Sequence, residues 1–358
     1  MRTCIPLILS LALLSSCSKE DVEDRSCSGT EAGIVSVKAT AGDFSGEIHN
    51  TAIWIYKKNP DVFRDEKAVA FAFSMDDNSV RLSLPSTGKT FYRIACNLPQ
   101  SFWGKKPDPA MLLKKDINDL EFGCLSCTSE SFIMSGSGTL TPSSDFGELS
   151  AGVKRRVAKV SVEKITNNIR TPGYASSNIA VEGFYIENGV AFIDMDWNER
   201  QPVSSSDFFN CSTIPPAMVK SPYLTSATPW SLAQCVIRSP VTIRHGGFAN
   251  FTPMLYAVYA CRNTITADHR WTLEQVMTER SWPLRKTRLV IHCTVGNKSM
   301  FYAITLDKVE PDTWYRFKSI NLRHAGSTDP DIPVEISDAD FSIEINNWEH
   351  NPQYTENI

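Results

Sequence analysis

Short runs in which apolar and polar residues alternate fill much of this chain, and this period of two constrains its fold more than any other feature. Side chains of a β-strand point alternately to opposite faces, so each run would have one apolar and one polar face. The pattern is strictest at 341–346. The other runs expected to form strands are 34–38, 51–56, 68–73, 80–84, 91–96, 157–165, 179–186, 255–261, 287–295, 300–306 and 314–322.

Turn-forming residues separate the runs, which favours antiparallel sheets with one face on a core. Residues 76–78 and 85–88 are such turns, and Gly296-Asn297 is typical of a two-residue hairpin turn. One helix is expected to begin at Pro109, because the apolar residues up to Leu120 fall on one side of a helix.

The runs fall into two sets. Breakers near 136–144 predict a crossover at 140–152, and the Pro- and Ser-rich residues 201–229 predict long loops. The sequence therefore predicts an all-β, mainly antiparallel protein of two tandem β-sandwich domains with a few short helices. The expected domains are 33–150 and 151–358.

The composition is that of a folded globular chain without a basic surface. Of 358 residues, 42% are hydrophobic and 21% charged, and the formal net charge is -4. Basic doublets are scattered, so nucleic acid is not an expected partner.

The first seventeen residues predict export and lipidation. Arg2 precedes a short apolar run, and Leu14-Ser15-Ser16 leads into Cys17 as in a lipoprotein signal peptide. Residues 1–16 would be removed, and acyl chains on Cys17 would hold the protein on a membrane. The alternative is an ordinary secretory signal with an incidental cysteine.

Residues 17–32 are polar and acidic and are expected to form a flexible tether. The stretch 19–24 also resembles the export signal that sends some Gram-negative lipoproteins to the outer surface. A surface-exposed position on the cell outer membrane is therefore expected.

The chain has ten cysteines. An exported protein can form disulfides, and one or two are compatible with the sequence. Several cysteines lie inside apolar strand patterns, as Cys96 and Cys261 do, which favours mostly buried thiols. Cys124 and Cys127 have the spacing of a redox or zinc pair, but no second pair accompanies them.

No motif predicts a catalytic residue, a metal site or a cofactor. Residues 85–90 end like a phosphate-binding loop but lack its first glycine, and 244–248 resemble an oxyanion-hole loop without a nucleophile elbow. The six histidines show no metal-ligand spacing. Asp194 and Asp196 are more typical of a solvated turn than of a glycosidase pair.

The last strand pattern is the most informative for function. Phe341, Ile343 and Ile345 lie on one face, and Trp348 follows. The preceding loop contains Pro330 and Pro333, which cannot donate hydrogen bonds within a sheet. Such a terminal strand can pair in its own sheet or add to the sheet of another molecule.

The order of several motifs resembles the fimbrillin family of type V pilins over nearly the whole chain. The motifs are the lipobox 14–17, 157–162 after Arg155-Arg156, 314–320, Gly326-Ser327 with Asp329-Pro330, and 343–348. The resemblance implies two tandem transthyretin-like β-sandwich domains, export as a lipoprotein, and polymerisation on the outer surface by donor-strand exchange.

The chain departs from that family at the expected processing site. In stalk subunits of the family, an arginine-specific protease removes the lipidated start and the first strand and so opens a groove for a neighbour's strand. The equivalent strand is 34–39, where Ile34, Val35 and Val37 would plug the groove. Residues 40–50 contain neither Arg nor Lys, which favours an anchor or accessory subunit.

The leading functional hypothesis is therefore a structural subunit of an adhesive fimbria, not an enzyme. Its expected partners are other pilin subunits, the outer membrane through the lipid on Cys17, and a host or bacterial surface receptor. The alternative is a monomeric surface lipoprotein that binds glycans through exposed tryptophans, although a core role is expected for Trp54, Trp314 and Trp348.

Overall fold

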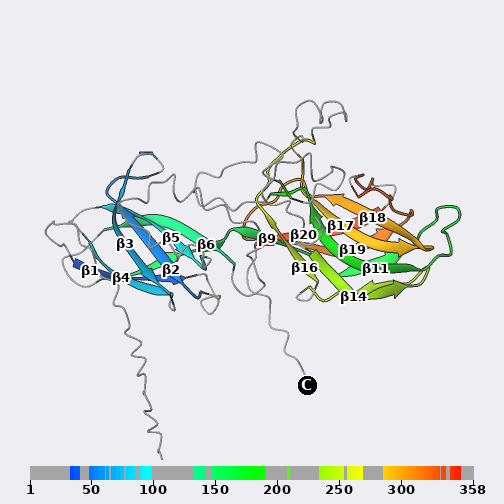
Figure 1. Cartoon of the computed structure of the whole chain (residues 1–358), viewed down its shortest axis with the longest axis horizontal. Helices are drawn as coiled ribbons and strands as arrows, with labels where there is room; N and C mark the ends of the chain where they lie inside the picture. Colours follow the sequence, from blue (N-terminus) through cyan, green and yellow to red (C-terminus); the bar gives the residue numbers. More distant parts are fainter. Residues whose placement is uncertain are drawn as a thin grey trace, which may run out of the picture.

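The computed structural model describes two β-sandwiches side by side along the long axis of the molecule (Figure 1). The described residues are 33–40, 48–60, 62–63, 66–75, 78–84, 89–98, 132–141, 147–190, 208–209, 234–253, 256–268, 285–330, 332–335 and 339–347. These residues contain no helix, and their strands pair mainly antiparallel, which confirms the predicted all-β class. The expected helix near Pro109 and the predicted signal peptide lie outside the described residues.

The first sandwich packs a three-stranded sheet on a five-stranded one. The strand order of the small sheet is β4 (Ser79–Leu84), β1 (Gly33–Thr40), β7 (Gly147–Gly152). The order of the larger sheet is β3 (Ala68–Ser74), β2 (Thr51–Tyr56), β5 (Thr90–Cys96), β6 (Met134–Leu140), β8 (Lys154–Arg155). One apolar cluster, which includes Val37, Ile53, Leu82 and Ala151, fills the space between them.

The second sandwich is built around β19 (Thr313–Leu322). Along one edge, β19 pairs in parallel with β9 (Val157–Val162) and then with β10 (Lys164–Asn167), which lie end to end. On their outer edges, β9 pairs with β16 (Ala257–Cys261) and β10 pairs with β15 (Phe248–Asn250), both antiparallel. β20 (Ala339–Asn347) runs antiparallel along the other edge of β19.

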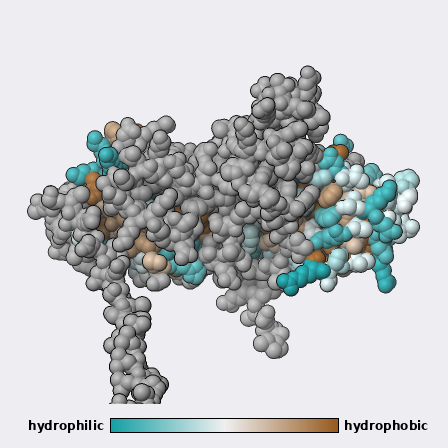
Figure 2. All heavy atoms as spheres, viewed as in Figure 1, coloured by the Kyte–Doolittle hydropathy of each residue, from teal (hydrophilic) through white to brown (hydrophobic). Residues whose placement is uncertain are grey.

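The facing sheet has the order β14 (Gln234–Ile243), β11 (Ile179–Glu187), β17 (Arg288–Val295), β18 (Lys298–Thr305). A small ladder joins β12 (Gly189–Val190) to β13 (Phe208–Phe209). The described surface at this end of the molecule is mainly hydrophilic, with a few apolar residues (Figure 2). The buried side chains of both sheets, including Val160, Ile291, Tyr302 and Phe317, form one core.

The predicted hairpin at Gly296-Asn297 is confirmed. Both residues have positive φ, 53° and 68°, and connect β17 to β18 with Val295 opposite Lys298. A two-residue turn with two positive φ angles matches the twist of the strands it joins, and Gly and Asn tolerate that backbone best.

The two sandwiches are joined by polar and aromatic contacts. β8 pairs with β6, which places Arg155 in the first sandwich, and its guanidinium donates to Asp312 at 3.3 Å in the turn before β19. The rings of Phe132 and Tyr259 add a contact between sandwiches at 4.7 Å. Burial raises the pKa of Asp312, and the charge of Arg155 opposes that shift.

The predicted crossover at 140–152 is not one uninterrupted connection, because β7 lies inside it and pairs with β1 of the first sandwich. The sequence analysis also missed β6, whose glycines looked like breakers. A side chain at Gly136 would overlap the carbonyl oxygen of Gly152, and one at Gly138 would come within 2.7 Å of the Tyr92 hydroxyl. Gly136 therefore lets the two sheets approach each other, and Gly138 makes room for the ring of Tyr92 on the adjacent strand of its own sheet.

This close approach gives a stability prediction. Gly136→Ala should lower the free energy of unfolding by about 1–3 kcal/mol, because backbone must move to admit the methyl group. Gly152→Ala is the matched control, since nothing lies within 4 Å of its added carbon. Chemical unfolding of both variants measures the difference. Equal effects would contradict the close contact.

Candidate functional site

The candidate site is the edge of the second sandwich where β20 lies. β20 pairs along its length with β19, with Ile345 opposite Tyr315, Ile343 opposite Phe317 and Phe341 opposite Ile320. Among the described residues, β19 is the one strand that β20 pairs with. Within this described part of the chain, one backbone edge of β20 therefore has no partner strand, as is required for pairing with a further strand.

The apolar side of β20 is only half buried. Phe341, Ile343 and Ile345, called the apolar row below, are 42%, 37% and 59% exposed. Directly opposed residues of an antiparallel pair share a face, so the row lies on the core side, beside buried Phe317. The rings of Phe341 and Phe317 are 5.9 Å apart. The row thus projects beyond the core that it borders.

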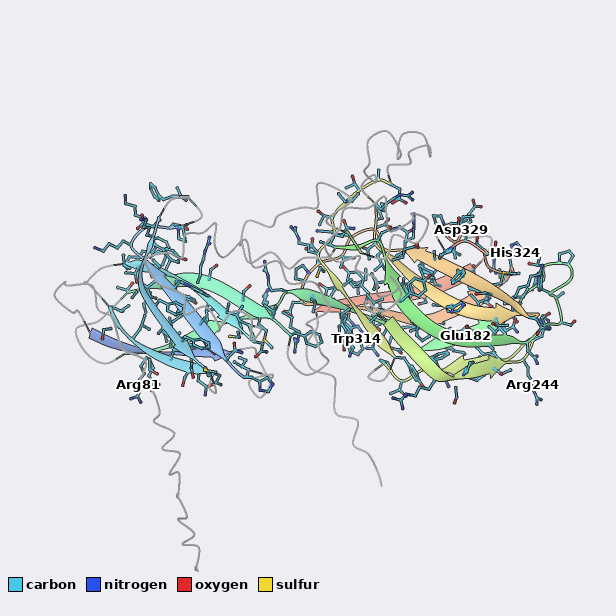
Figure 3. All side chains as sticks on the ribbon, viewed as in Figure 1. Arg81, Glu182, Arg244, Trp314, His324 and Asp329 are labelled. Carbon is cyan, nitrogen blue, oxygen red and sulfur yellow. The ribbon has the colours of Figure 1, made fainter. Side chains whose placement is uncertain are left out.

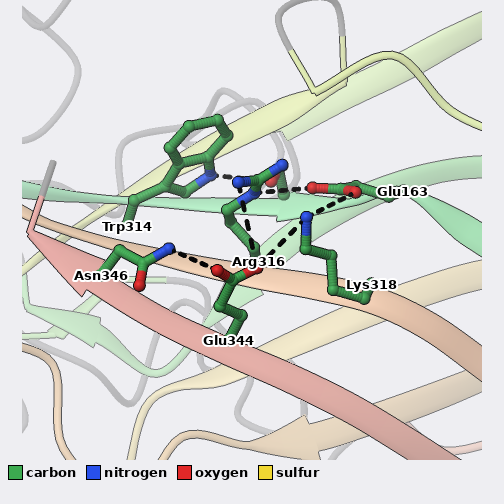
Figure 4. A network of polar contacts seen from close by, with 7 residues as sticks. Glu163, Trp314, Arg316, Lys318, Glu344 and Asn346 are labelled. Atoms are coloured by element: carbon green, nitrogen blue, oxygen red, sulfur yellow. Dashed lines mark hydrogen bonds and ion pairs between the residues drawn. The ribbon is translucent and has the colours of Figure 1, made fainter. Parts of the chain in front are cut away.

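The other side of β20 is polar and lies against a charge network (Figure 4). Arg316 and Lys318 of β19 stand between two carboxylates. Arg316 donates to Glu163 at 2.7 Å and lies 3.9 Å from Glu344. Lys318 lies 3.3 Å from Glu163 and 3.2 Å from Glu344. Glu163 sits between β9 and β10, so the network spans three adjacent strand positions of the sheet.

Two features fix the geometry of this network. The register of β19 against β20 shifts between Phe317 and Ser319, so Lys318 is an extra residue at a β-bulge. Hydrogen bonds from Asn346 and then Lys318 lower the pKa of Glu344 below its ordinary 4.5. Its contacts are therefore complete at neutral pH and are lost only as the pH falls through the lowered pKa.

A buried tryptophan supports the same network. The guanidinium of Arg316 lies 4.4 Å from the ring centre of Trp314, and the ammonium of Lys159 lies 4.4 Å from the same ring. The indole N–H donates to Ser161 Oγ at 2.8 Å. These contacts position the Arg316 guanidinium against the polar face of β20.

The second feature of interest is β1, the strand expected to plug a groove. It lies between β4 and β7 and pairs with both, antiparallel and parallel respectively. Val37 and Ala39 are fully buried. Ala39 was not predicted as part of the plug. For Ile34 and Val35, the structure gives the backbone register only, with Ile34 opposite Ser83 and Val35 opposite Leu82.

Among the described strands, β1 is the one that joins β4 to β7 in this sheet, because the strand order is β4, β1, β7. Without β1, both would keep an unpaired backbone edge facing the other. The walls of this gap would be the apolar cluster of the first sandwich, which includes Leu82, Leu84 and Ala151. This is the geometry that a replacement strand requires.

Cys17 and Trp348 lie outside the described residues. Trp54 and Trp314 are 0% and 4% exposed, which confirms their predicted core roles and removes them as a sugar-stacking surface. The glycines of the loop 244–248 form a turn, with Gly246 at φ 72°.

The expectation of a buried thiol is confirmed for Cys96 and wrong for Cys261. Cys261 is disulfide-bonded, whereas Cys96 and Cys293 are free and buried. Burial raises the pKa of Cys96 to about 12, partly offset by a hydrogen bond with Thr51. Burial also raises the pKa of Cys293. Both therefore stay protonated and act as small apolar side chains.

Sequence analysis missed one polar row on the outer face of the second sandwich. His292 Nε2 lies 2.7 Å from Ser299 Oγ, and its Nδ1 lies 3.3 Å from Glu182 Oε2. A β-bulge in β11 occurs at Glu182, which also accepts a hydrogen bond from Thr294. Glu182 and His292 are far apart in sequence, so only the sheet register reveals the row. Figure 3 labels Glu182 on β11.

This contact order is that of a serine–histidine–acid relay. Glu182 and His292 are about a third exposed, 32% and 31%, on an open sheet face. Relay chemistry also needs aligned oxyanion donors and exclusion of water. The row is therefore best explained as a hydrogen-bond network that holds the bulge. Within the described residues there is no metal-ligand cluster, and no helix there is long and apolar enough to span a membrane.

The fold is similar to those of solved structures described as candidate cell adhesion proteins and a fimbrilin. A candidate cell adhesion protein from Parabacteroides distasonis aligns with a TM-score of 0.56 and 11% identity over 91% of this chain and 99% of its own. A candidate cell adhesion protein from Bacteroides eggerthii aligns with a TM-score of 0.56 and 13% identity over 90% of this chain and 98% of its own. A fimbrilin from Porphyromonas gingivalis aligns with a TM-score of 0.54 and 10% identity over 90% of this chain and 99% of its own.

No protein-family model and no curated protein sequence matches the chain. At these identities, the structural likeness concerns the fold. It extends over both sandwiches and agrees with the two-domain fold that the sequence resemblance implied.

The half-buried apolar row gives a test on the monomer. Ile345→Ala should cost less than about 1 kcal/mol of stability, because Ile345 is 59% exposed. Ile320→Ala, the same change at a fully buried position of β19, should cost about 2–5 kcal/mol. Chemical unfolding measures both. A comparable loss for the two would show that the row is part of the monomer's core.

Proposed function

We propose that the chain is a structural subunit of a cell-surface fimbria and joins its neighbour by strand exchange. In this proposal, β20 of the donor enters a neighbouring subunit that lacks its first strand, at the position that β1 occupies here between β4 and β7. The observation that carries it is the apolar row, which remains about half exposed on an edge strand. The fold shared with a fimbrilin and with candidate cell adhesion proteins supports a role in a fimbria.

Burial supplies the driving force. A fully buried Phe or Ile side chain contributes roughly 1.5–3 kcal/mol, so each residue of the row would gain about 1 kcal/mol on entering a closed groove. The β1 position is such an environment, since Val37 and Ala39 are 0% exposed there. β20 would lose its ladder with β19 and gain one on each side, because β1 pairs with two strands.

Whether a copy donates, accepts or does both depends on β1. A copy that retains β1 can donate β20 but cannot accept a strand, so it would end a polymer. Residues 40–50 contain no Arg or Lys for an arginine-specific protease. We therefore propose an anchor or accessory subunit that keeps β1 and a lipid on Cys17, attached to the outer membrane.

The proposal is tested by making the chain cleavable. Phe44→Arg places an arginine in the segment after β1, and the folded variant is cut with an arginine-specific protease. The cut protein should release the segment that ends at residue 44 and contains β1, and it should then polymerise, because β4 and β7 become able to accept β20. Size-exclusion chromatography with light scattering and electron microscopy measure assembly.

The matched controls are on β20 itself. Combined Phe341→Ser, Ile343→Ser and Ile345→Ser should abolish polymerisation of the cut protein, whereas Ser342→Ala on the polar side should not. Uncut protein should stay monomeric. Polymers that form from the triple variant, or cut protein that releases its first strand and remains monomeric, would refute strand exchange through β20.

A further inference from the structure

β20 is attached to its own sheet by a backbone ladder and by contacts on both of its faces. Phe341, Ile343 and Ile345 on the core side are 37–59% exposed, so they contribute only part of their possible burial. Its outer-face residues include Asp340 and Glu344, both carboxylates. The residues of β19, and the one after it, that form ion pairs with them are the cations Arg316, Lys318 and Arg323.

The contacts lie at two points along the strand. Near its start, Arg323 forms an ion pair with Asp340. Near its end, Glu344 faces Arg316 at 3.9 Å and Lys318 at 3.2 Å. Both cations are themselves held by Glu163, at 2.7 and 3.3 Å. They are therefore positioned before β20 arrives, and they remain paired after it leaves.

We propose that these ion pairs form an electrostatic clasp that holds β20 on its own domain, so that ionic strength controls how readily β20 is released. The use of the released strand by a second copy rests on the proposed function. The clasp itself is a property of the monomer.

Salt distinguishes the clasp from apolar attachment. The carboxylates of Asp340 and Glu344 are 42% and 43% exposed, so mobile ions reach them. Screening weakens such pairs within a Debye length of about 8 Å at physiological ionic strength. Salt does not weaken apolar contacts and can strengthen them. A strand held by charge is therefore released by added NaCl, and a strand held by burial is not.

The experiment is hydrogen–deuterium exchange on the intact, uncut protein, followed in peptides that cover 339–347. Glu344→Gln and Asp340→Asn preserve shape and remove charge. Each should increase exchange in β20 roughly two- to tenfold, and the double variant should exceed either. Raising NaCl from low to high concentration should increase exchange in the wild type and much less in the double variant.

Asp307→Asn is the matched control. Asp307 is a surface carboxylate that pairs with Lys286 at 2.9 Å, away from β20, so its loss should leave β20 exchange unchanged. Exchange in β20 that responds neither to salt nor to the two substitutions would overturn the clasp, even if cut protein polymerises. Faster exchange in the variants, with cut protein that never polymerises, would support the clasp and count against strand exchange.

Discussion

The parallel pairing of β19 with β9 and β10 is the contact on which the second sandwich depends. It brings residues more than 150 positions apart into one sheet, and the buried side chains of Val160, Phe317 and Ile320 form the core on one face. It also places Glu163 beside Arg316 on the other face. Only then does β19 offer an ordered edge, with fixed cations, to which β20 can attach.

The two strands relevant to assembly differ in how they are held. β1 has a partner on each side and buries Val37 and Ala39 completely. β20 has one partner among the described residues, and its apolar row remains partly in water. An edge strand with an exposed apolar face is ordinarily an aggregation hazard. Its acidic outer face, matched to the cations of β19, keeps it docked while leaving the row accessible.

Strands whose apolar residues alternate could be predicted from the sequence. Strands such as β6, in which glycines make room for neighbouring atoms, could not. β20 and the β17–β18 hairpin follow directly from alternation and from Gly296-Asn297. β6 was hidden because Gly136 and Gly138 are there to admit neighbouring atoms, not to break a strand. The charge network could not be predicted, because it depends on a bulge at Lys318 and on a register between distant strands. A resemblance to a family supplied the function proposed for β20, because alternation alone leaves that function open.

Strand exchange requires β20 to leave its own sheet and complete another. A high-resolution electron microscopy map of the fibre formed by the cut protein shows whether it does. If β20 is exchanged, density for residues 339–347 of one copy lies between β4 and β7 of the next, with Phe341, Ile343 and Ile345 facing the apolar cluster there. A map in which β20 remains paired with its own β19, and copies join through another surface, would contradict strand exchange.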